Sequence, residues 1–235
     1  MIGVVDYGAG NLRSVQAALD RAGASWRNVA GPEDLAGLER LILPGVGHFG
    51  AAARRLRQAG LFAPLREFAA SGAPFLGICL GMQLLFEGSE EEPREPGLGV
   101  LPGMVRRLDA PRLPHIGWTL VEPAAGAEGS ILAAAPGPFF AYFAHTFAAP
   151  ADAAGTVAVA TCPPPFAAAV RRGAAWGLQF HPEKSGGVGQ AILLAFAGSI
   201  DPPRPGGEAR PAGEARPAGE APPARGARRA GEAGP

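Results

Sequence analysis

The sequence is poor in the residues that mark several large classes of protein. It has two cysteines in 235 residues, Cys79 and Cys162, too few for a disulfide framework and not spaced as metal ligands. Its 21 basic and 21 acidic residues balance, which excludes recognition of nucleic acid or of a membrane surface by bulk charge. The longest apolar stretch, around residues 74 to 86, is shorter than a membrane span. We therefore expect no metal, no cofactor and no membrane segment.

What is present is a large apolar fraction, 47%, which is enough for a substantial core. Residues 1 to 6 lack a basic leader and reach an acid early, so we expect a cytoplasmic protein. Residues 200 to 235 are almost entirely Pro, Gly, Ala, Arg and Glu, and they contain no large apolar run to bury. This composition predicts one domain over residues 1–199, followed by a disordered tail over 200–235.

Strand-like and helix-like patterns alternate along the first part of the chain. Strands are expected at 2–5, 41–43 and 75–76, and helices at 11–22, at 49–71 and from the residue after Cys79 through Phe86. This order is typical of an α/β fold with a doubly wound, mostly parallel sheet flanked by helices, of the flavodoxin-like kind. Short strand-like pieces between 103 and 180 predict a small antiparallel extension, and a helix at 187–197 should pack back on the sheet.

The strongest chemical signal is a cysteine between two glycines, in Gly77-Ile78-Cys79-Leu80-Gly81. This pattern is typical of a nucleophile elbow, in which a strand turns sharply into a helix and the central residue adopts a strained backbone conformation. A side chain at 77 or 81 would collide with the neighbouring strand and helix. Backbone N–H groups at the start of the helix would favour a thiolate. The alternative is a buried cysteine with a packing role only.

A second signal lies far downstream, in His181-Pro182-Glu183. Pro182 pushes His181 toward an extended conformation, so the imidazole and the carboxylate should project from one side of a strand end. The alternative is a surface histidine followed by a carboxylate at a helix N-terminus. Beside a cysteine elbow, the triplet favours a catalytic triad of Cys79, His181 and Glu183.

A glycine-containing loop, Pro44-Gly45-Val46-Gly47, follows an expected parallel strand. In an open sheet it lies at the carboxyl edge, where the elbow also emerges, so it should face Cys79. A backbone N–H of this loop could stabilise an oxyanion together with the N–H of Leu80. A plain tight turn is the alternative, and a phosphate-binding loop is disfavoured because no Gly-Lys-Ser/Thr follows.

These motifs together resemble the triad-type (class I) glutamine amidotransferases, and more closely their HisH-type members, the glutaminase subunits of imidazole glycerol phosphate synthase. The resemblance spans essentially all of residues 1–199. The blocks that carry it are residues 77–83 and 179–183 for the class, and residues 6–12, 44–49, 114–118, 142–145 and 184–185 for the HisH type.

The resemblance implies roles for the matching positions. Cys79 attacks the side-chain amide carbon of glutamine, His181 transfers protons and Glu183 orients the imidazole. Ammonia then passes to a HisF-type (β/α)8-barrel cyclase subunit, which makes imidazole glycerol phosphate and an aminoimidazole carboxamide ribotide in histidine biosynthesis. The other implied positions are Gly45, Val46 and Leu80 for the oxyanion, Gly47, Gln83, Thr146 and Phe147 for the substrate, and Asn11, Trp118, Tyr142 and Lys184 for the partner interface.

Some positions depart from the family pattern, and some alternatives stay open. Thr119 stands where the family often has Asn, and Thr146-Phe147 where it often has Ser-Tyr. His115 and His145 are expected to be structural or interface groups that donate hydrogen bonds to the backbone. Neither replaces His181, because neither has a carboxylate two residues on. The open alternatives are the glutaminase subunit of another class I amidotransferase, a catalytically silent scaffold subunit, and a thiol protease.

Overall fold

The computed structural model describes residues 1–8, 12–124, 130–135 and 137–198. The expected tail over 200–235 and the interface candidate Asn11 lie outside the described residues. Within the described ranges, no helix has the length and apolar character needed to cross a membrane.

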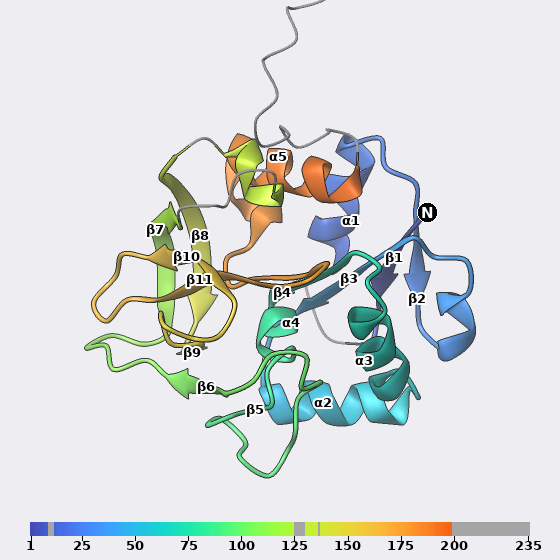
Figure 1. Ribbon diagram of the computed structural model, residues 1–235, viewed down its shortest axis with the longest axis horizontal. Coiled ribbons are helices and arrows are strands. Elements are labelled where there is room, and N and C mark those ends of the chain that lie inside the picture. The colour runs from blue at the N-terminus through green and yellow to red at the C-terminus, as the bar shows by residue number, and fades with distance from the viewer. Residues whose placement is uncertain (9–11, 125–129, 136, 199–235) are drawn as a thin grey trace, which may run out of the picture. The chain divides into compact units, whose positions relative to one another are not determined.

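A nine-stranded sheet forms the centre of the fold, in the order β2-β1-β3-β4-β12-β11-β10-β7-β8 (Figure 1). The first five of these strands are parallel, namely β2 (Trp26–Val29), β1 (Ile2–Val5), β3 (Arg40–Gly45), β4 (Phe75–Cys79) and β12 (Ala175–Leu178). Every residue of β1, β4 and β12 is buried, as expected for parallel strands covered on both faces. The predicted α/β fold with a parallel sheet is confirmed.

The remaining strands of the sheet are antiparallel and form the predicted extension. They are β11 (Phe166–Arg172), β10 (Thr156–Ala160), β7 (His115–Pro123) and β8 (Phe139–His145). A separate three-stranded sheet contains β5 (Gly88–Ser89), β6 (Met104–Arg107) and β9 (Phe147–Ala148). Because β9 follows β8 directly, the small sheet is tied to the edge of the large one close to His145.

Helices cover both faces of the parallel strands (Figure 1). Helices α1 (Leu12–Arg21) and α5 (Gly186–Ala197) lie on one face, and α2 (Phe49–Gln58) and α3 (Phe62–Ala70) lie on the other. The helical stretch expected over 49–71 is therefore two helices, separated at Gly60, whose φ of +69° suits glycine. Three short 3₁₀ helices complete the described elements: η1 (Pro32–Leu35), η2 (Ile131–Ala134) and η3 (Pro182–Lys184).

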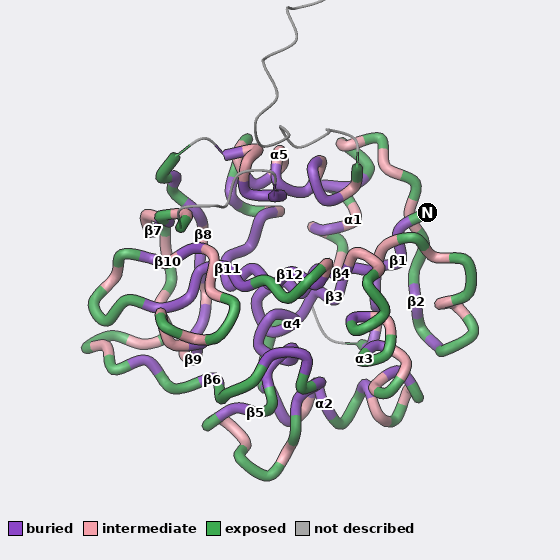
Figure 2. Tube along the Cα trace, in the orientation of Figure 1, coloured by how far each residue is buried: buried purple, intermediate pink, exposed green. Residues whose placement is uncertain are grey.

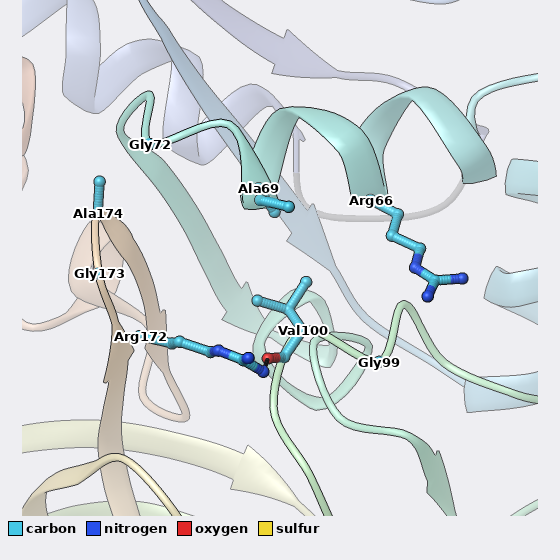
Figure 3. Close-up of a pocket in the computed structure, with 9 residues that line it drawn as sticks. Arg66, Ala69, Gly72, Gly99, Val100, Arg172, Gly173 and Ala174 are labelled. Carbon is cyan, nitrogen blue, oxygen red and sulfur yellow. Dashed lines mark hydrogen bonds between the residues drawn. The ribbon is translucent and has the colours of Figure 1, made fainter.

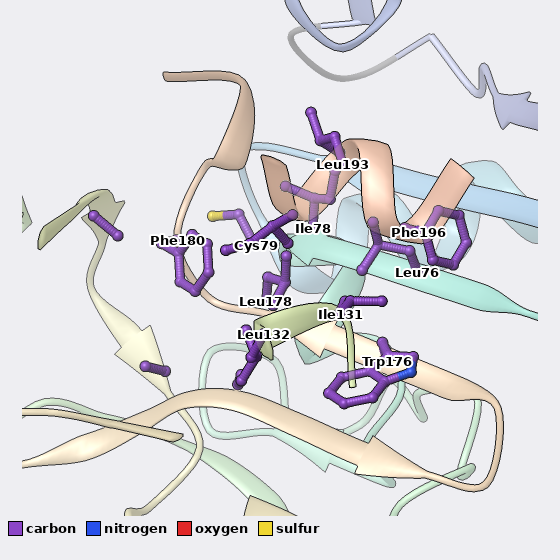
Figure 4. Packing of buried hydrophobic residues seen from close by; sticks show 14 of the residues in the cluster. Leu76, Ile78, Cys79, Ile131, Leu132, Trp176, Leu178, Phe180, Leu193 and Phe196 are labelled. Carbon is purple, nitrogen blue, oxygen red and sulfur yellow. The ribbon is translucent and has the colours of Figure 1, made fainter. Parts of the chain in front are cut away.

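The buried side chains form two clusters, and the buried segments run through the centre of the fold (Figure 2). The first cluster includes the buried residues of α1 and α5, and Cys79 belongs to it (Figure 4). The second includes the buried residues of α2 and α3 together with Leu80. Consecutive residues of the elbow thus pack into different clusters, which fixes the turn between β4 and the helix after it.

Two local predictions were wrong, for identifiable reasons. The helix after Cys79, α4 (Leu80–Gln83), ends before Phe86 because the N–H groups of Leu85 and Phe86 donate to carbonyls three residues back, at 3.0 and 3.1 Å, and not to those four residues back. The carbonyls of residues 84–86 then accept hydrogen bonds from the loop at 98–101, at N···O distances of 2.7, 2.9 and 3.1 Å. Strand β2 was not predicted because it contains the exposed Arg27 and Asn28 and lacks an apolar run.

Candidate active site

Cys79 has the backbone conformation expected of a nucleophile elbow. Its φ of +54° is positive, and no other non-glycine residue in the described ranges has a positive φ. Glycine is required on both sides of it. A Cβ at Gly81 would lie 1.8 Å from the Leu43 carbonyl oxygen, and one at Gly77 would lie 2.5 Å from the Gly81 carbonyl oxygen. The close approach of β4, α4 and β3 therefore holds Cys79 in its strained conformation.

His181 and Glu183 meet in a 3₁₀ turn rather than at a strand end, which corrects the predicted geometry. The strand β12 ends at Leu178, and Pro182 begins η3. The turn brings the His181 Nδ1 to 2.8 Å from the Glu183 Oε1, and both side chains are almost fully buried. The other carboxylate oxygen is buried without a hydrogen-bond partner in the described part of the chain. A buried carboxylate with one partner depends strongly on that partner being charged.

Two hydrogen bonds attach this turn to the antiparallel part of the sheet, and a third within the turn closes them into a ring. The His181 N–H donates to the Tyr142 carbonyl at 2.9 Å, and the Tyr142 N–H donates to the Ser185 hydroxyl at 3.0 Å. The Ser185 hydroxyl in turn donates to the His181 carbonyl at 2.7 Å. Since Ser185 is buried, this closed ring fixes the position of the imidazole relative to β8.

The imidazole also lies beside the thiol of Cys79 and interacts with it, which joins the elbow to the His-Pro-Glu turn. Burial by itself lowers the pKa of His181. The interactions with Cys79 and Glu183 outweigh burial and raise the pKa to about 9. The structure therefore brings the three predicted triad residues together, with His181 protonated at neutral pH.

A cavity of about 220 Å³ opens directly beside the sulfur. Most of the residues predicted for the oxyanion and the substrate line it, together with Cys79 and four others. The lining residues are Val46, Gly47, Cys79, Leu80, Gln83, Glu91, Pro114, Ala144, His145, Thr146 and Phe147. Gly45 does not line this cavity, but it pairs with Cys79 across β3 and β4, so its peptide lies next to the elbow.

The glycine loop is open to solvent at its centre and anchored at its end. Val46 is exposed, and Gly47 has a φ of +96°, which favours glycine. Past the loop, His48 caps α2 by accepting from the Gly50 N–H at 3.2 Å. The Phe49 N–H donates to the Glu91 carboxylate at 2.6 Å. The anchored end leaves the peptides between Gly45 and Gly47 as the part of the loop that faces the cavity.

The structure also involves polar residues that sequence reasoning missed. Glu91 is the acidic side chain that lines the cavity. The Tyr7 hydroxyl is buried without a partner in the described ranges, and burial, followed by the Cys79 charge, raises the pKa of Tyr7 above its usual range. Gln179 contacts the sulfur itself, at 3.7 Å. Its position two residues before His181 was the available signal.

The remaining histidines have structural partners. His145 is buried, which lowers its pKa to about 3, and its Nδ1 lies 3.0 Å from the Phe147 carbonyl oxygen, as predicted. His115 does not pair with the backbone as predicted. Its Nε2 lies 2.9 Å from the Thr119 hydroxyl and its Nδ1 lies 3.8 Å from the Cys162 sulfur, so both ring nitrogens face side chains.

Three of the four predicted interface residues lie close together. Trp118 is 55% exposed, and its ring centroid is 6.2 Å from that of Tyr142. Lys184 also contacts Tyr142, with its ammonium 5.5 Å from the centroid of the ring. In the sequence, Lys184 directly follows the triad candidate Glu183. Ile116 and Phe140, on the same two strands, are also exposed.

A larger cavity, of about 330 Å³, lies away from the triad candidates, between α3, the loop at Gly99 and the β11–β12 turn (Figure 3). Arg66 and Arg172 line it, and Arg172 donates to the Val100 carbonyl. None of the predicted site residues lines this cavity. Size alone would favour it, but the chemistry of the lining residues favours the smaller cavity beside Cys79.

Comparison with known proteins identifies a family model that matches residues 4–197, described as glutamine amidotransferase class-I. The chain is 47% identical over 204 residues to imidazole glycerol phosphate synthase subunit HisH of Rhodopirellula baltica, covering 84% of this chain and 97% of that relative. It is 41% identical to the HisH subunit of Deinococcus radiodurans, over 85% of this chain and 94% of that relative.

A fused relative and a solved structure add to this. The chloroplastic imidazole glycerol phosphate synthase hisHF of Arabidopsis thaliana is 43% identical over 83% of this chain, but the match covers 34% of that longer protein. A crystal structure of a glutamine amidotransferase superposes with a TM-score of 0.67 at 25% identity, covering 84% of this chain and 98% of the other.

Proposed function

Because this chain belongs to the class-I glutamine amidotransferase family, we propose that the cavity beside Cys79 binds glutamine and that Cys79, His181 and Glu183 hydrolyse it. The chain is the glutaminase subunit of imidazole glycerol phosphate synthase, an enzyme of histidine biosynthesis. The observation that carries the residue assignment is a cysteine at positive φ, beside a buried imidazole, at the edge of a cavity.

The first half of the reaction forms a thioester. The Cys79 thiolate attacks the side-chain amide carbon of glutamine, and the carbonyl oxygen becomes an oxyanion. The N–H of Leu80 and an N–H of Gly45 or Val46 stabilise this oxyanion. The His181 imidazolium donates its proton to the amide nitrogen, the C–N bond breaks, and ammonia leaves. The raised pKa of His181 supports this order, since the imidazole begins the cycle protonated.

The second half releases glutamate. Neutral His181 accepts a proton from water as the water oxygen attacks the thioester carbon, and the C–S bond breaks to restore the thiolate. Glu183 stabilises the imidazolium and holds the ring by its Nδ1, at 2.8 Å. Gln83, with the backbone of Gly47, Thr146 and Phe147, holds the substrate. The Thr146 carbonyl already accepts from the Leu108 N–H at 3.0 Å and the Phe147 carbonyl from the Gln83 amide at 2.7 Å, so both carbonyls are occupied by the protein itself.

The ammonia goes to a second, HisF-type barrel cyclase subunit. A subunit of a synthase needs its partner, and the fused Arabidopsis relative has about two-thirds of its length outside the match to this chain. We assign Trp118, Tyr142 and Lys184, with Asn11, to the contact with that partner. The position of Lys184 directly after Glu183 supports a contact next to the proposed triad, which would keep the path of ammonia short.

Replacement of Cys79 tests the residue assignment. With the cyclase subunit present, Cys79→Ala should abolish synthesis from glutamine and leave synthesis from added ammonium salt near the level of the unchanged chain, because only the nucleophile is lost. Cys162→Ala is the matched control and should keep both activities. If Cys79→Ala lost both activities while remaining folded, Cys79 would have a structural role instead.

A further inference from the structure

The sulfur of Cys79 has a second buried polar neighbour besides His181. Strands β4 and β12 pair with Ile78 opposite Leu178, so the next residues along them, Cys79 and Gln179, lie side by side. The Gln179 Nε2 is 3.7 Å from the sulfur, within hydrogen-bond range for a sulfur acceptor, and Gln179 is fully buried. Its backbone is fixed as well, because its N–H donates to the Ala168 carbonyl at 2.9 Å.

The orientation of the Gln179 amide follows from its partners. The Phe147 carbonyl can only accept, so the atom of Gln83 that lies 2.7 Å from it must be the amide nitrogen. The same nitrogen lies 3.1 Å from Gln179, which must therefore present its oxygen to Gln83. The NH₂ group of Gln179 is then the end that faces the sulfur, and it can only donate.

The Phe147 carbonyl, where this series of hydrogen bonds begins, is also bound by His145. Its Nδ1 lies 3.0 Å from the same Phe147 carbonyl oxygen, and burial keeps the imidazole neutral. A neutral imidazole facing a carbonyl must donate from that nitrogen, so the Phe147 oxygen accepts two hydrogen bonds. The side-chain amide of Gln83 therefore cannot flip, because a flip would place its oxygen against the Phe147 carbonyl oxygen, and both of these atoms only accept.

We propose that Gln179 donates a hydrogen bond to the Cys79 thiolate, and that Gln83 and the Phe147 carbonyl hold the Gln179 amide in the donating orientation. A donor stabilises the charged form of the sulfur, so Gln179 adds to the effect of the His181 imidazolium. It also restricts the sulfur to one position between the two donors. The catalytic consequence rests on the proposed glutaminase function, whereas the effect on the thiolate does not.

The charged and titratable groups around the sulfur come from several elements. His181 and Glu183 lie on the turn at η3, Tyr7 follows β1, and Glu91 and His145 line the cavity. Gln179 is a neutral donor among them. Its removal therefore changes the thiolate without adding or removing a charge.

The rate at which iodoacetamide alkylates Cys79, measured against pH, tests the proposal without any glutamine. All chains carry Cys162→Ser, so that one thiol reacts. Gln179→Met keeps the length of the side chain and removes the donor, and it should raise the midpoint of the alkylation profile by about one pH unit, for the loss of one hydrogen bond to a charged group. Gln83→Met should raise it by less, since the Gln179 amide loses only its fixed orientation.

Gln190→Met is the matched control. Gln190 is a half-buried glutamine whose Nε2 donates to the Ala18 carbonyl at 2.9 Å, and its replacement should leave the midpoint unchanged. An equal midpoint for the Gln179, Gln190 and unchanged chains would overturn the proposal. If the Gln179 variant does not fold, NMR of the unchanged chain replaces it. The chemical shifts of the Gln179 side-chain amide protons should then change with pH around the midpoint of the alkylation profile. A signal that does not move across that range would also overturn it.

Measuring glutaminase activity on the same chains separates the two proposals. An unchanged chain that alkylates with the expected profile but hydrolyses no glutamine with its partner would contradict the proposed function and not the role of Gln179. An active unchanged chain with an unaltered profile in Gln179→Met would contradict only the role of Gln179.

Discussion

At the scale of single residues, the site combines a strained nucleophile with a histidine that holds its proton tightly. The Cys79 backbone is in a conformation that residues with side chains rarely adopt, and its sulfur interacts with His181 and lies 3.7 Å from the Gln179 Nε2. Each contact is to a group that favours a thiolate. The arrangement therefore supports the proposed role of Cys79 as the nucleophile.

The protonation of His181 predicts how stability depends on pH. Its pKa in the folded chain, about 9, is above the ordinary value of 6.5, so the folded state binds the proton more tightly than the unfolded state does. This contribution to the free energy of unfolding is complete below about pH 6.5 and is lost as the pH rises through about 9. Thermal unfolding at pH 6, 7.5 and 9 would measure this contribution to the free energy of unfolding, and the two limiting pH values hold to about one pH unit.

His181→Gln is the control for this prediction, since it cannot take up a proton. The difference in melting temperature between the unchanged chain and His181→Gln should shrink steadily from pH 6 to pH 9. A difference that stays constant or grows over this range would mean that the histidine is neutral in the folded chain, and the proposed proton transfer to the leaving ammonia would then lack its donor.

At the scale of elements, the site depends on how closely α4 approaches the strands beside it. Gly81→Ala would place a Cβ 1.8 Å from the Leu43 carbonyl oxygen, which belongs to the backbone of β3 and cannot move alone. We expect this substitution to lower the free energy of unfolding by about 4 kcal/mol or more, at the upper end of single-residue effects, or to prevent folding. Chemical denaturation with urea would measure it.

Gly187→Ala is the matched control, because Gly187 lies in α5 and a Cβ there would meet no heavy atom within 4 Å. Alanine is the better helix former, so this change should be neutral or stabilise by up to about 1 kcal/mol. Equal stability of the Gly81 and Gly187 variants would show that α4 can shift away from β3 without penalty.

Features that depend on residues close together in the sequence could be predicted, and features that depend on distant residues could not. The elbow was predictable because the close approach of β3, β4 and α4 requires glycine at positions 77 and 81, and both glycines flank Cys79 in the sequence. The length of α4 was not predictable, because its last turn tightens and the carbonyls that follow bond the distant loop at 98–101, and neither feature is encoded in a helical pattern. Gln179 was missed for the same reason: its meaning comes from Cys79, one hundred positions away, through the pairing of β4 and β12.

At the scale of the whole molecule, the described chain presents an apolar patch beside its active site. We define the patch as Ile116, Trp118, Phe140 and Tyr142, on the adjacent strands β7 and β8. The first three are 61%, 55% and 60% exposed, unusually high for large apolar side chains that gather in one place. The ring of ordered hydrogen bonds around Tyr142 and His181 connects this patch to the triad, so a subunit that binds the patch also contacts the element that holds the imidazole.

Trp118→Ala should therefore weaken binding of the barrel cyclase subunit by tenfold or more, since a tryptophan at the centre of an interface commonly contributes more than about 1.4 kcal/mol. Met104→Ala, which removes an exposed apolar side chain from β6 instead, is the matched control and should leave the affinity within about twofold. Both variants should keep the melting temperature of the unchanged chain, because neither side chain lies in a core cluster. Titration calorimetry with the purified cyclase subunit would decide. Equal affinities for the two variants would move the interface away from β7 and β8, and the short path for ammonia past Lys184 would then have to be abandoned.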